Sequence, residues 1–156
     1  MANILVVDDE LGIRDLLSEI LNDEGHSVDL AENATQARSA RAGNSYDLVL
    51  LDIWMPDTDG VSLLKEWATA GVLTMPVIMM SGHATIDTAV EATRIGAFSF
   101  LEKPITLQKL LKAVEQGLAR EGGSMTRVAE KTGLERTHLY RKLRQLGVDL
   151  GRGKRG

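Results

Sequence analysis

The stretch Leu48-Val49-Leu50-Leu51-Asp52 decides the fold of this chain, because four apolar residues in a row are followed directly by an acid. Three other short runs end on a side chain that can hold a metal ion or a phosphoryl group. Ile4 to Val7 leads into Asp8 and Asp9, Val77 to Met80 into Ser81, and Phe98 to Glu102 into Lys103. In an open parallel sheet the carboxyl ends of the strands line one crevice, where ligands bind. The four runs therefore predict one pocket built from residues far apart in the sequence.

Apolar runs alternate with amphipathic stretches up to residue 120, which is the pattern of repeated strand-helix units around a parallel sheet. A run such as Val77 to Met80 could also be a buried helix, but its length and the flanking Pro76, Ser81 and Gly82 favour a strand. We expect strands near 4–7, 27–31, 47–51, 77–80 and 98–101, and helices near 12–23, 34–42, 61–69, 86–95 and 106–120. This pattern predicts an α/β domain.

The last of these helices carries a clear apolar stripe, formed by Leu107, Leu110, Leu111, Val114 and Leu118. Thr106 is placed to cap its first turn. We therefore expect this helix to bury one face.

The composition excludes several classes of protein. The chain has 156 residues, 44% apolar and 26% charged, which suits a globular domain of about 120 residues with a small appendage. It has no cysteine, so disulfides and thiolate metal sites are excluded. No apolar run reaches the length of a signal-peptide core or of a membrane span. We expect a soluble, cytoplasmic protein without a membrane partner.

The net charge of −4 hides an asymmetry between the two parts of the chain. Residues 1–120 carry 9 Lys and Arg against 18 Asp and Glu, a net charge of −9. Residues 121–156 carry 9 against 4, a net charge of +5. A basic end on an acidic body suggests contact with nucleic acid, because Lys and Arg neutralise phosphates. A charged end that is merely solvated is the alternative, and charge alone leaves both open.

The acids among the strand-end residues suit magnesium and phosphoryl chemistry. Mg²⁺ takes oxygen ligands, usually one or two carboxylates together with waters and phosphate. Asp8, Asp9 and Asp52 offer such oxygens, and Lys103 can offset their mutual repulsion. A carboxylate can attack phosphorus to form an acyl phosphate while the metal and the ammonium take up charge, and Ser81 can then donate a hydrogen bond to a phosphoryl oxygen.

Each of these residues also has an ordinary explanation when it is taken alone. Asp8 or Asp9 could cap the helix that begins near Gly12. Ser81 could be a turn residue, and Lys103 could be solvated. Asp52 is harder to explain away, because a buried strand rarely ends in an acid without cause. All of them together at strand ends favour the shared pocket.

Four segments resemble the receiver domains of two-component response regulators: Ile4 to Glu10, Asp52 to Gly60, Met80 to His83, and Phe100 to Pro104. The resemblance covers about residues 2–120. It implies a flavodoxin-like, doubly wound sheet of five parallel strands in the order 2-1-3-4-5. Such domains act as switches that accept a phosphoryl group from a sensor histidine kinase.

The resemblance also implies a role for each pocket residue. Asp52 is then the phosphoacceptor, and Ser81 and Lys103 hold the phosphoryl group. Mg²⁺ is bound by Asp8, Asp9, Asp52 and the backbone carbonyl of Trp54. Phe100 matches the aromatic residue that, with Ser81, forms the family's switch. Phe98 is the competing candidate, and we expect it in the core.

Two matched positions carry a separate hypothesis. Trp54 lies two residues after Asp52, and His83 lies two residues after Ser81, where side chains can shield or admit the water that hydrolyses an acyl phosphate. We expect the bulky Trp54 to slow self-dephosphorylation, so Trp54→Asn should change the half-life of the phosphoryl group. His83 could share this role or be a surface residue without one.

The basic end has the spacing of a helix-turn-helix. Ala129, Gly133 and Leu139 stand where such a motif needs a small residue at a helix crossing, a glycine in the turn and an apolar anchor. An amphipathic helical pair that docks on the first domain is the alternative. The outer face of the second predicted helix displays the candidate DNA contacts Arg136, Thr137, His138, Tyr140, Arg141 and Arg144.

The segment Val128 to Leu143 resembles the Fis-type helix-turn-helix of nitrogen-regulation response regulators, and the receiver half resembles their NtrX-type branch. Those regulators usually carry an AAA+ ATPase between the two modules, for which this chain has no room. It also lacks a P-loop, because Val148 stands at the first glycine and Arg155 at the Ser or Thr position around Gly153 and Lys154. We expect a receiver at 1–120, a hinge at 121–124, a helix-turn-helix at 125–148 and a flexible basic tail at 149–156.

The patterns and the two resemblances together imply a bacterial, phosphorylation-switched regulator that binds DNA, controls transcription and forms a homodimer at least when phosphorylated. Its only expected reactions are magnesium-dependent self-phosphorylation and slow self-dephosphorylation. One alternative is a protein-interaction switch whose tail does not bind DNA. Another is an aspartyl phosphatase, but Trp54 stands where that chemistry needs a second acid.

Overall fold

The structure, a computed structural model, describes residues 2–82 and 85–121. In this range the strands are β1 (Asn3–Val7), β2 (Ser27–Ala31), β3 (Leu48–Asp52), β4 (Val77–Ser81) and β5 (Ser99–Glu102). The helices are α1 (Leu11–Asp23), α2 (Ala34–Gly43), α3 (Gly60–Thr69), α4 (Ile86–Ile95) and α5 (Leu107–Glu121). The chain divides into two compact units, of which the first ends at Ile105 and the second begins at Thr106, directly before α5.

The strands form one parallel sheet in the order β2-β1-β3-β4-β5, which confirms the predicted fold class and strand order. The register aligns Val7 of β1 with Ala31 and Leu51, Asp52 of β3 with Met80, and Ser81 with Glu102. The carboxyl ends of the strands therefore reach the same edge of the sheet. The residues that directly follow the strand ends lie close to one another at that edge.

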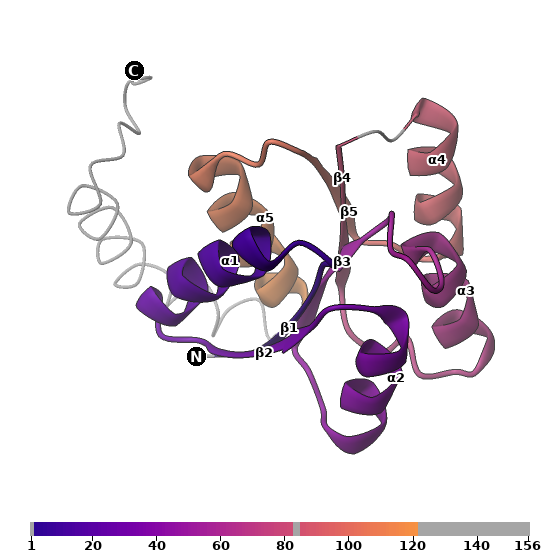
Figure 1. Ribbon diagram of the computed structural model, residues 1–156, viewed down its shortest axis with the longest axis horizontal. Helices are drawn as coiled ribbons and strands as arrows, with labels where there is room; N and C mark the ends of the chain where they lie inside the picture. The colour runs from indigo at the N-terminus through magenta and orange to yellow at the C-terminus, as the bar shows by residue number, and fades with distance from the viewer. Residues whose placement is uncertain (1, 83–84, 122–156) are drawn as a thin grey trace. The chain divides into compact units, whose positions relative to one another are not determined.

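The central strands β3 and β4 are buried along their whole length. Figure 1 shows why: α1 covers one face of the sheet, and α2, α3 and α4 cover the other. A parallel strand with helices on both faces needs apolar side chains in nearly every position, unlike a strand with one wet face. The continuous runs in the sequence, rather than an alternation, were therefore the correct strand signal.

Alternate strand residues supply the core beneath α2, α3 and α4. Leu5, Val7, Val49, Leu51, Val77 and Met79 belong to one buried cluster. The helices contribute Ala34 and Ala37 from α2, Leu63, Leu64 and Trp67 from α3, and Ala92 from α4. The small residues of α2 let that helix approach the sheet closely.

Side-chain caps mark the starts of three of the helices in the first unit. Asn33 accepts from the Gln36 N–H at the start of α2, Asp59 from the Ser62 N–H at α3, and Thr85 from the Thr88 N–H at α4. Gly96 follows α4 with φ of +140°, a conformation that side chains rarely adopt, and so ends that helix. The predicted and observed bounds of all ten elements differ by at most one residue at either end.

The second unit begins as predicted, with the Thr106 hydroxyl accepting from the Lys109 N–H at 3.2 Å. Leu110, Leu111 and Val114 of the predicted stripe are buried. Residue 121, the first of the predicted hinge, is the last residue of α5. The predicted helix-turn-helix and basic tail lie outside the described residues. Among those that are described, no helix combines the length and apolarity needed to cross a membrane.

Candidate functional site

Three carboxylates meet at the carboxyl edge of the sheet. Asp8 and Asp9 follow β1 and Asp52 is the last residue of β3, and one oxygen from each lies within 4.8 Å of the others. Asp8 is fully buried and Asp52 is 3% exposed, whereas Asp9 is open to solvent. The structure thus brings together the three acids named from the sequence, two of them away from water.

Lys103, which directly follows β5, supplies the opposing charge. Its Nζ lies 2.8 Å from Asp8 Oδ2, 3.1 Å from Glu10 Oε1 and 3.5 Å from Asp52 Oδ1. Burial alone would lower the pKa of Lys103, but the hydrogen bond to Asp8 and the charges around it raise that pKa above its ordinary value. The lysine is therefore a permanent cation in the pocket.

One ammonium does not balance this group of acids. Burial, the first cause, and the charge of Asp8 raise the pKa of Asp52 to about 7, against the opposing effect of Lys103. A divalent cation among the carboxylates would remove this deficit of positive charge, because a bound ion dominates the local electrostatics. The donor set is made only of oxygens, and one of its three acids, Asp9, is open to solvent, which fits Mg²⁺ with its retained waters.

Ser81 and Phe100 lie on β4 and β5, the two strands that follow β3 in the sheet. Ser81 ends β4, is fully buried, and accepts a hydrogen bond at its carbonyl oxygen from the Lys103 N–H at 2.8 Å. Phe100, in β5, is partly buried and packs against the core cluster. Phe98, which was expected in the core, directly precedes β5 and is only partly buried.

The β3–α3 loop (Ile53–Asp59) leads away from Asp52 and is closed at its base. The Ile53 N–H donates to Met80 O at 2.9 Å, and the Gly60 N–H donates to Ile53 O at 2.6 Å. A Cβ at Gly60 would collide with the carbonyl oxygen of Asp52, so only glycine fits there. Between these fixed points Trp54 projects its side chain, which is 52% exposed.

The sequence did not identify two residues that shape the turn after β1. The Arg14 guanidinium, 11% exposed, donates from Nη1 to the Asp8 carbonyl oxygen at 2.7 Å. The Glu10 N–H donates to Asp8 Oδ1 at 2.9 Å, while its carboxylate reaches Lys103. Glu10 is also the N-cap of α1 and makes no side-chain cap, so neither Asp8 nor Asp9 holds that position. The acidic run itself was the only local signal for Glu10, and Arg14 had none.

Two groups of named residues cannot be placed against this pocket. His83 lies outside the described residues. The six candidate DNA contacts, between Arg136 and Arg144, lie outside them as well.

Comparison with known families agrees with this geometry. Residues 4–115 match the response regulator receiver domain, and residues 112–146 match the Fis family of bacterial regulatory proteins. The two matches overlap at residues 112–115. No ATPase domain therefore separates them in this chain.

Individual relatives point to the same group. A putative NtrX-like response regulator of Rickettsia conorii is 37% identical over 139 residues, which are 88% of this chain and 27% of that protein. The nitrogen assimilation regulatory protein NtrX of Azorhizobium caulinodans is 40% identical over 118 residues, 74% of this chain and 26% of that protein. The chain thus spans about a quarter of the length of these curated relatives.

A solved structure extends the likeness to three dimensions. The crystal structure of the receiver domain of NtrX from Brucella abortus is 45% identical and superposes with a TM-score of 0.69. The match covers 74% of this chain and 97% of that one. The two domains therefore share the same fold.

Proposed function

The chain belongs to the response regulator receiver domain family, and we propose that it is a phosphorylation-switched, DNA-binding response regulator of a two-component system. The single observation that carries the proposal is the pocket of Asp8, Asp9 and Asp52 closed by Lys103, in a chain that continues into a Fis-family match. The matched families are regulators rather than classical enzymes, so the pocket is a signal input.

The input reaction is transfer of a phosphoryl group from a histidine kinase to Asp52. A carboxylate oxygen of Asp52 attacks phosphorus, the new P–O bond forms, and the P–N bond to the kinase imidazole breaks, with the electron pair staying on the imidazole. The nitrogen then takes a proton from solvent. Lys103 and the Ser81 hydroxyl donate to phosphoryl oxygens, and slow hydrolysis of the acyl phosphate resets the switch.

Asp8, Asp9, Asp52 and the Trp54 carbonyl are the proposed ligands of Mg²⁺. When bound, the ion supplies positive charge to the acids and to the phosphoryl oxygens. The residues themselves do the positioning: Asp8 is held by Arg14 and Lys103, and Asp52 lies at the end of a buried strand. Ionisation of Asp52, which its raised pKa opposes, becomes easier as positive charge enters the pocket.

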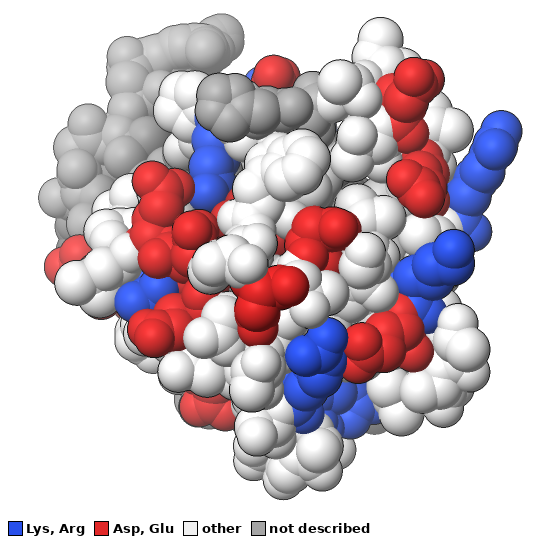
Figure 2. Space-filling view, turned by 45° about the vertical axis from the view of Figure 1, so that its right-hand side comes forward, with Lys and Arg blue, Asp and Glu red and all other residues white. Residues whose placement is uncertain are grey.

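The output is binding of DNA by the basic end. Figure 2 shows a face of the molecule on which acidic side chains gather across the middle, a surface that repels phosphates. Arg136, Thr137, His138, Tyr140, Arg141 and Arg144 are the proposed contacts. In a homodimer two recognition helices would stand roughly 34 Å apart, one turn of duplex.

Ser81 and Phe100 would report phosphorylation of Asp52 by moving toward the pocket. The proposed compartment of the protein is the bacterial cytoplasm.

Light scattering after size-exclusion chromatography tests the input and the switch together. The full chain and Asp52→Ala are compared with and without beryllium fluoride and Mg²⁺. We expect the mass of the wild type to rise toward that of a dimer only with the phosphoryl mimic, and the mass of Asp52→Ala to stay constant. An equal rise in both proteins would remove Asp52 from the proposal.

A further inference from the structure

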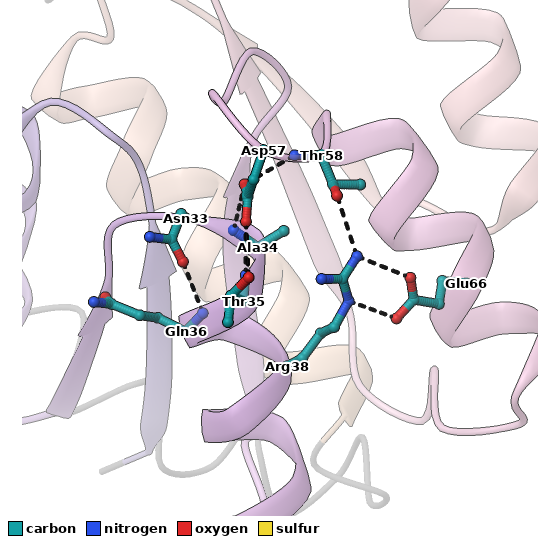
Figure 3. A network of polar contacts seen from close by, with 8 residues as sticks. All are labelled: Asn33, Ala34, Thr35, Gln36, Arg38, Asp57, Thr58 and Glu66. Carbon is teal, nitrogen blue, oxygen red and sulfur yellow. Dashed lines mark hydrogen bonds and ion pairs between the residues drawn. The ribbon is translucent and has the colours of Figure 1, made fainter.

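The tip of the β3–α3 loop is bonded to the first turn of α2 (Figure 3). Asp57 Oδ1 accepts from the Ala34 N–H at 3.1 Å, and Asp57 Oδ2 accepts from the Thr35 N–H at 3.1 Å and the Thr35 hydroxyl at 3.0 Å. Backbone N–H groups at the start of a helix otherwise lack partners within the helix. A residue from a distant loop therefore satisfies two of them.

The neighbouring residue of the loop makes a second link to α2. Arg38 donates from Nη2 to the Thr58 hydroxyl at 3.2 Å. The same guanidinium pairs with Glu66 of α3, with Nε 2.8 Å from Oε2 and Nη2 3.1 Å from Oε1. Such a two-pronged pair fixes the plane of the guanidinium. The loop tip is thus held by α2 through two consecutive residues.

These bonds add to a cap that α2 already has. The Asn33 side chain accepts from the Gln36 N–H at 2.8 Å and is the helix's own N-cap. Hydrogen bonds from the Ala34 and Thr35 N–H groups lower the pKa of Asp57 well below its ordinary value, so it stays ionised at working pH. Asp57 therefore connects the β3–α3 loop to α2, in addition to accepting hydrogen bonds from the first turn of that helix.

The connection bears on the pocket because the loop is short and is held at both ends. Ile53 is fixed at the base by its bonds to Met80 and Gly60. Only Trp54, Met55 and Pro56 separate it from Asp57. The ring of Pro56 also fixes one of the backbone angles in this span. The position of the Trp54 carbonyl, a proposed ligand, thus depends on where Asp57 is anchored.

We propose that Asp57 is a positioning residue for the pocket, which ties the β3–α3 loop to α2 and couples cation binding at Asp8, Asp9 and Asp52 to the order of the first turn of α2. The inference rests on the proposed function, since it takes the pocket to bind Mg²⁺. Coupling of this kind is reciprocal: a cation that fixes the loop also protects the first turn of α2, and loss of the tie weakens both.

The experiment compares two variants of the full chain that each remove one cap from α2. Asp57→Ala removes the tie to the loop, and Asn33→Ala, the matched control, removes the helix's own cap and leaves the tie. Calorimetric titration with MgCl₂ measures the dissociation constant, and hydrogen exchange over residues 33–38 measures the order of the first turn. We expect Asp57→Ala to raise the dissociation constant for Mg²⁺ about three- to ten-fold. This effect is smaller than that of removing a residue in direct contact with a metal ligand, because Asp57 acts through the loop.

We expect Asn33→Ala to bind Mg²⁺ like the wild type, although its first turn exchanges faster. In the wild type Mg²⁺ should slow exchange at Ala34 and Thr35, and in Asp57→Ala it should not. Asp57→Asn keeps one acceptor oxygen and should bind Mg²⁺ with an affinity between those of the wild type and Asp57→Ala. If the alanine variant does not fold, Asp57→Asn takes its place in the comparison with Asn33→Ala.

Two results would overturn the inference, and they are distinguishable. Equal affinities of the Asp57 and Asn33 variants for Mg²⁺, in a wild type that binds it, would reject the coupling and leave the proposed function intact. Absence of both a heat of binding and any effect of Mg²⁺ on hydrogen exchange in the wild type would reject the metal pocket and the inference with it.

Discussion

At the scale of single residues, Asp52 combines burial with the proximity of other acids. Its pKa of about 7 lies above its ordinary value of about 4, so the folded protein without metal holds a proton that the unfolded chain releases between these two pH values. The stabilisation from this proton is complete below about pH 4 and is lost as the pH rises through 7.

The melting temperature of the protein in EDTA should therefore fall between pH 5 and pH 8, and added Mg²⁺ should restore most of the loss at pH 8. Asp52→Asn has no charge to bury, so its melting temperature should exceed that of the wild type at pH 8 by several degrees. Scanning calorimetry at both pH values measures this. The exposed Asp23→Asn serves as control, and a pH response of Asp52→Asn equal to that of the wild type would contradict the assignment.

Gly60 gives a second prediction at this scale. Its missing side chain makes room for the carbonyl of Asp52, and this backbone of Asp52 and Ile53 cannot move aside as a flexible side chain could. Gly60→Ala should destabilise the protein by about 2–3 kcal/mol, as expected for overpacking at a rigid contact. Urea unfolding measures the change. Gly12→Ala is the control, because a Cβ there meets nothing within 4 Å and should stabilise α1 by about 0.5–1 kcal/mol.

At the scale of elements, the pair Arg38–Glu66 joins α2 to α3. Its side chains are 37% and 46% exposed, so solvent screens the attraction. A double-mutant cycle of Arg38→Met and Glu66→Gln should give a coupling energy of about 0.5 kcal/mol at low salt, and less at high salt. Denaturant unfolding of the four proteins measures it. A coupling of zero at low salt would mean that the bidentate geometry contributes nothing to stability.

The elements themselves were largely predictable from the sequence. The type of each element depends on local signals: continuous apolar runs for buried parallel strands, and apolar stripes with caps for helices. Thus α4 has the predicted bounds, and β3 extends one residue further to include Asp52. The strand-end acids were predictable for the same reason, since a polar residue after a buried run is a local signal.

Contacts between distant residues were not predictable in this way. Lys103 and Glu10 are 93 positions apart, and Asp57 lies 22 positions from Thr35. Their pairing follows from the strand order and the path of the β3–α3 loop, which no local pattern encodes. Arg14 shows the same limit, because a basic residue in the first turns of a helix gives no hint that it binds a particular carbonyl.

At the scale of the whole molecule, the opposite charges of residues 1–120 and 121–156 predict strongly salt-dependent binding to DNA. Replacing one proposed phosphate contact, as in Arg144→Ala, should reduce the slope of log affinity against log salt concentration by about 1. The exposed Lys65→Ala, in the acidic part of the chain, should leave the slope unchanged. Salt-titrated binding of the full chain measures both, and absence of binding at low salt would favour a protein-interaction switch.

The two tryptophans differ in their surroundings: Trp54 is 52% exposed beside the pocket, and Trp67 is 4% exposed in the core. An indole in water emits at longer wavelength than one in an apolar interior, and a small polar quencher reaches only the former. Light emitted by Trp54 can thus be separated from that of Trp67 without any attached dye. Trp54 is therefore an optical probe two residues after Asp52 in the unmodified chain, and we expect its emission to follow occupancy of the proposed pocket in real time.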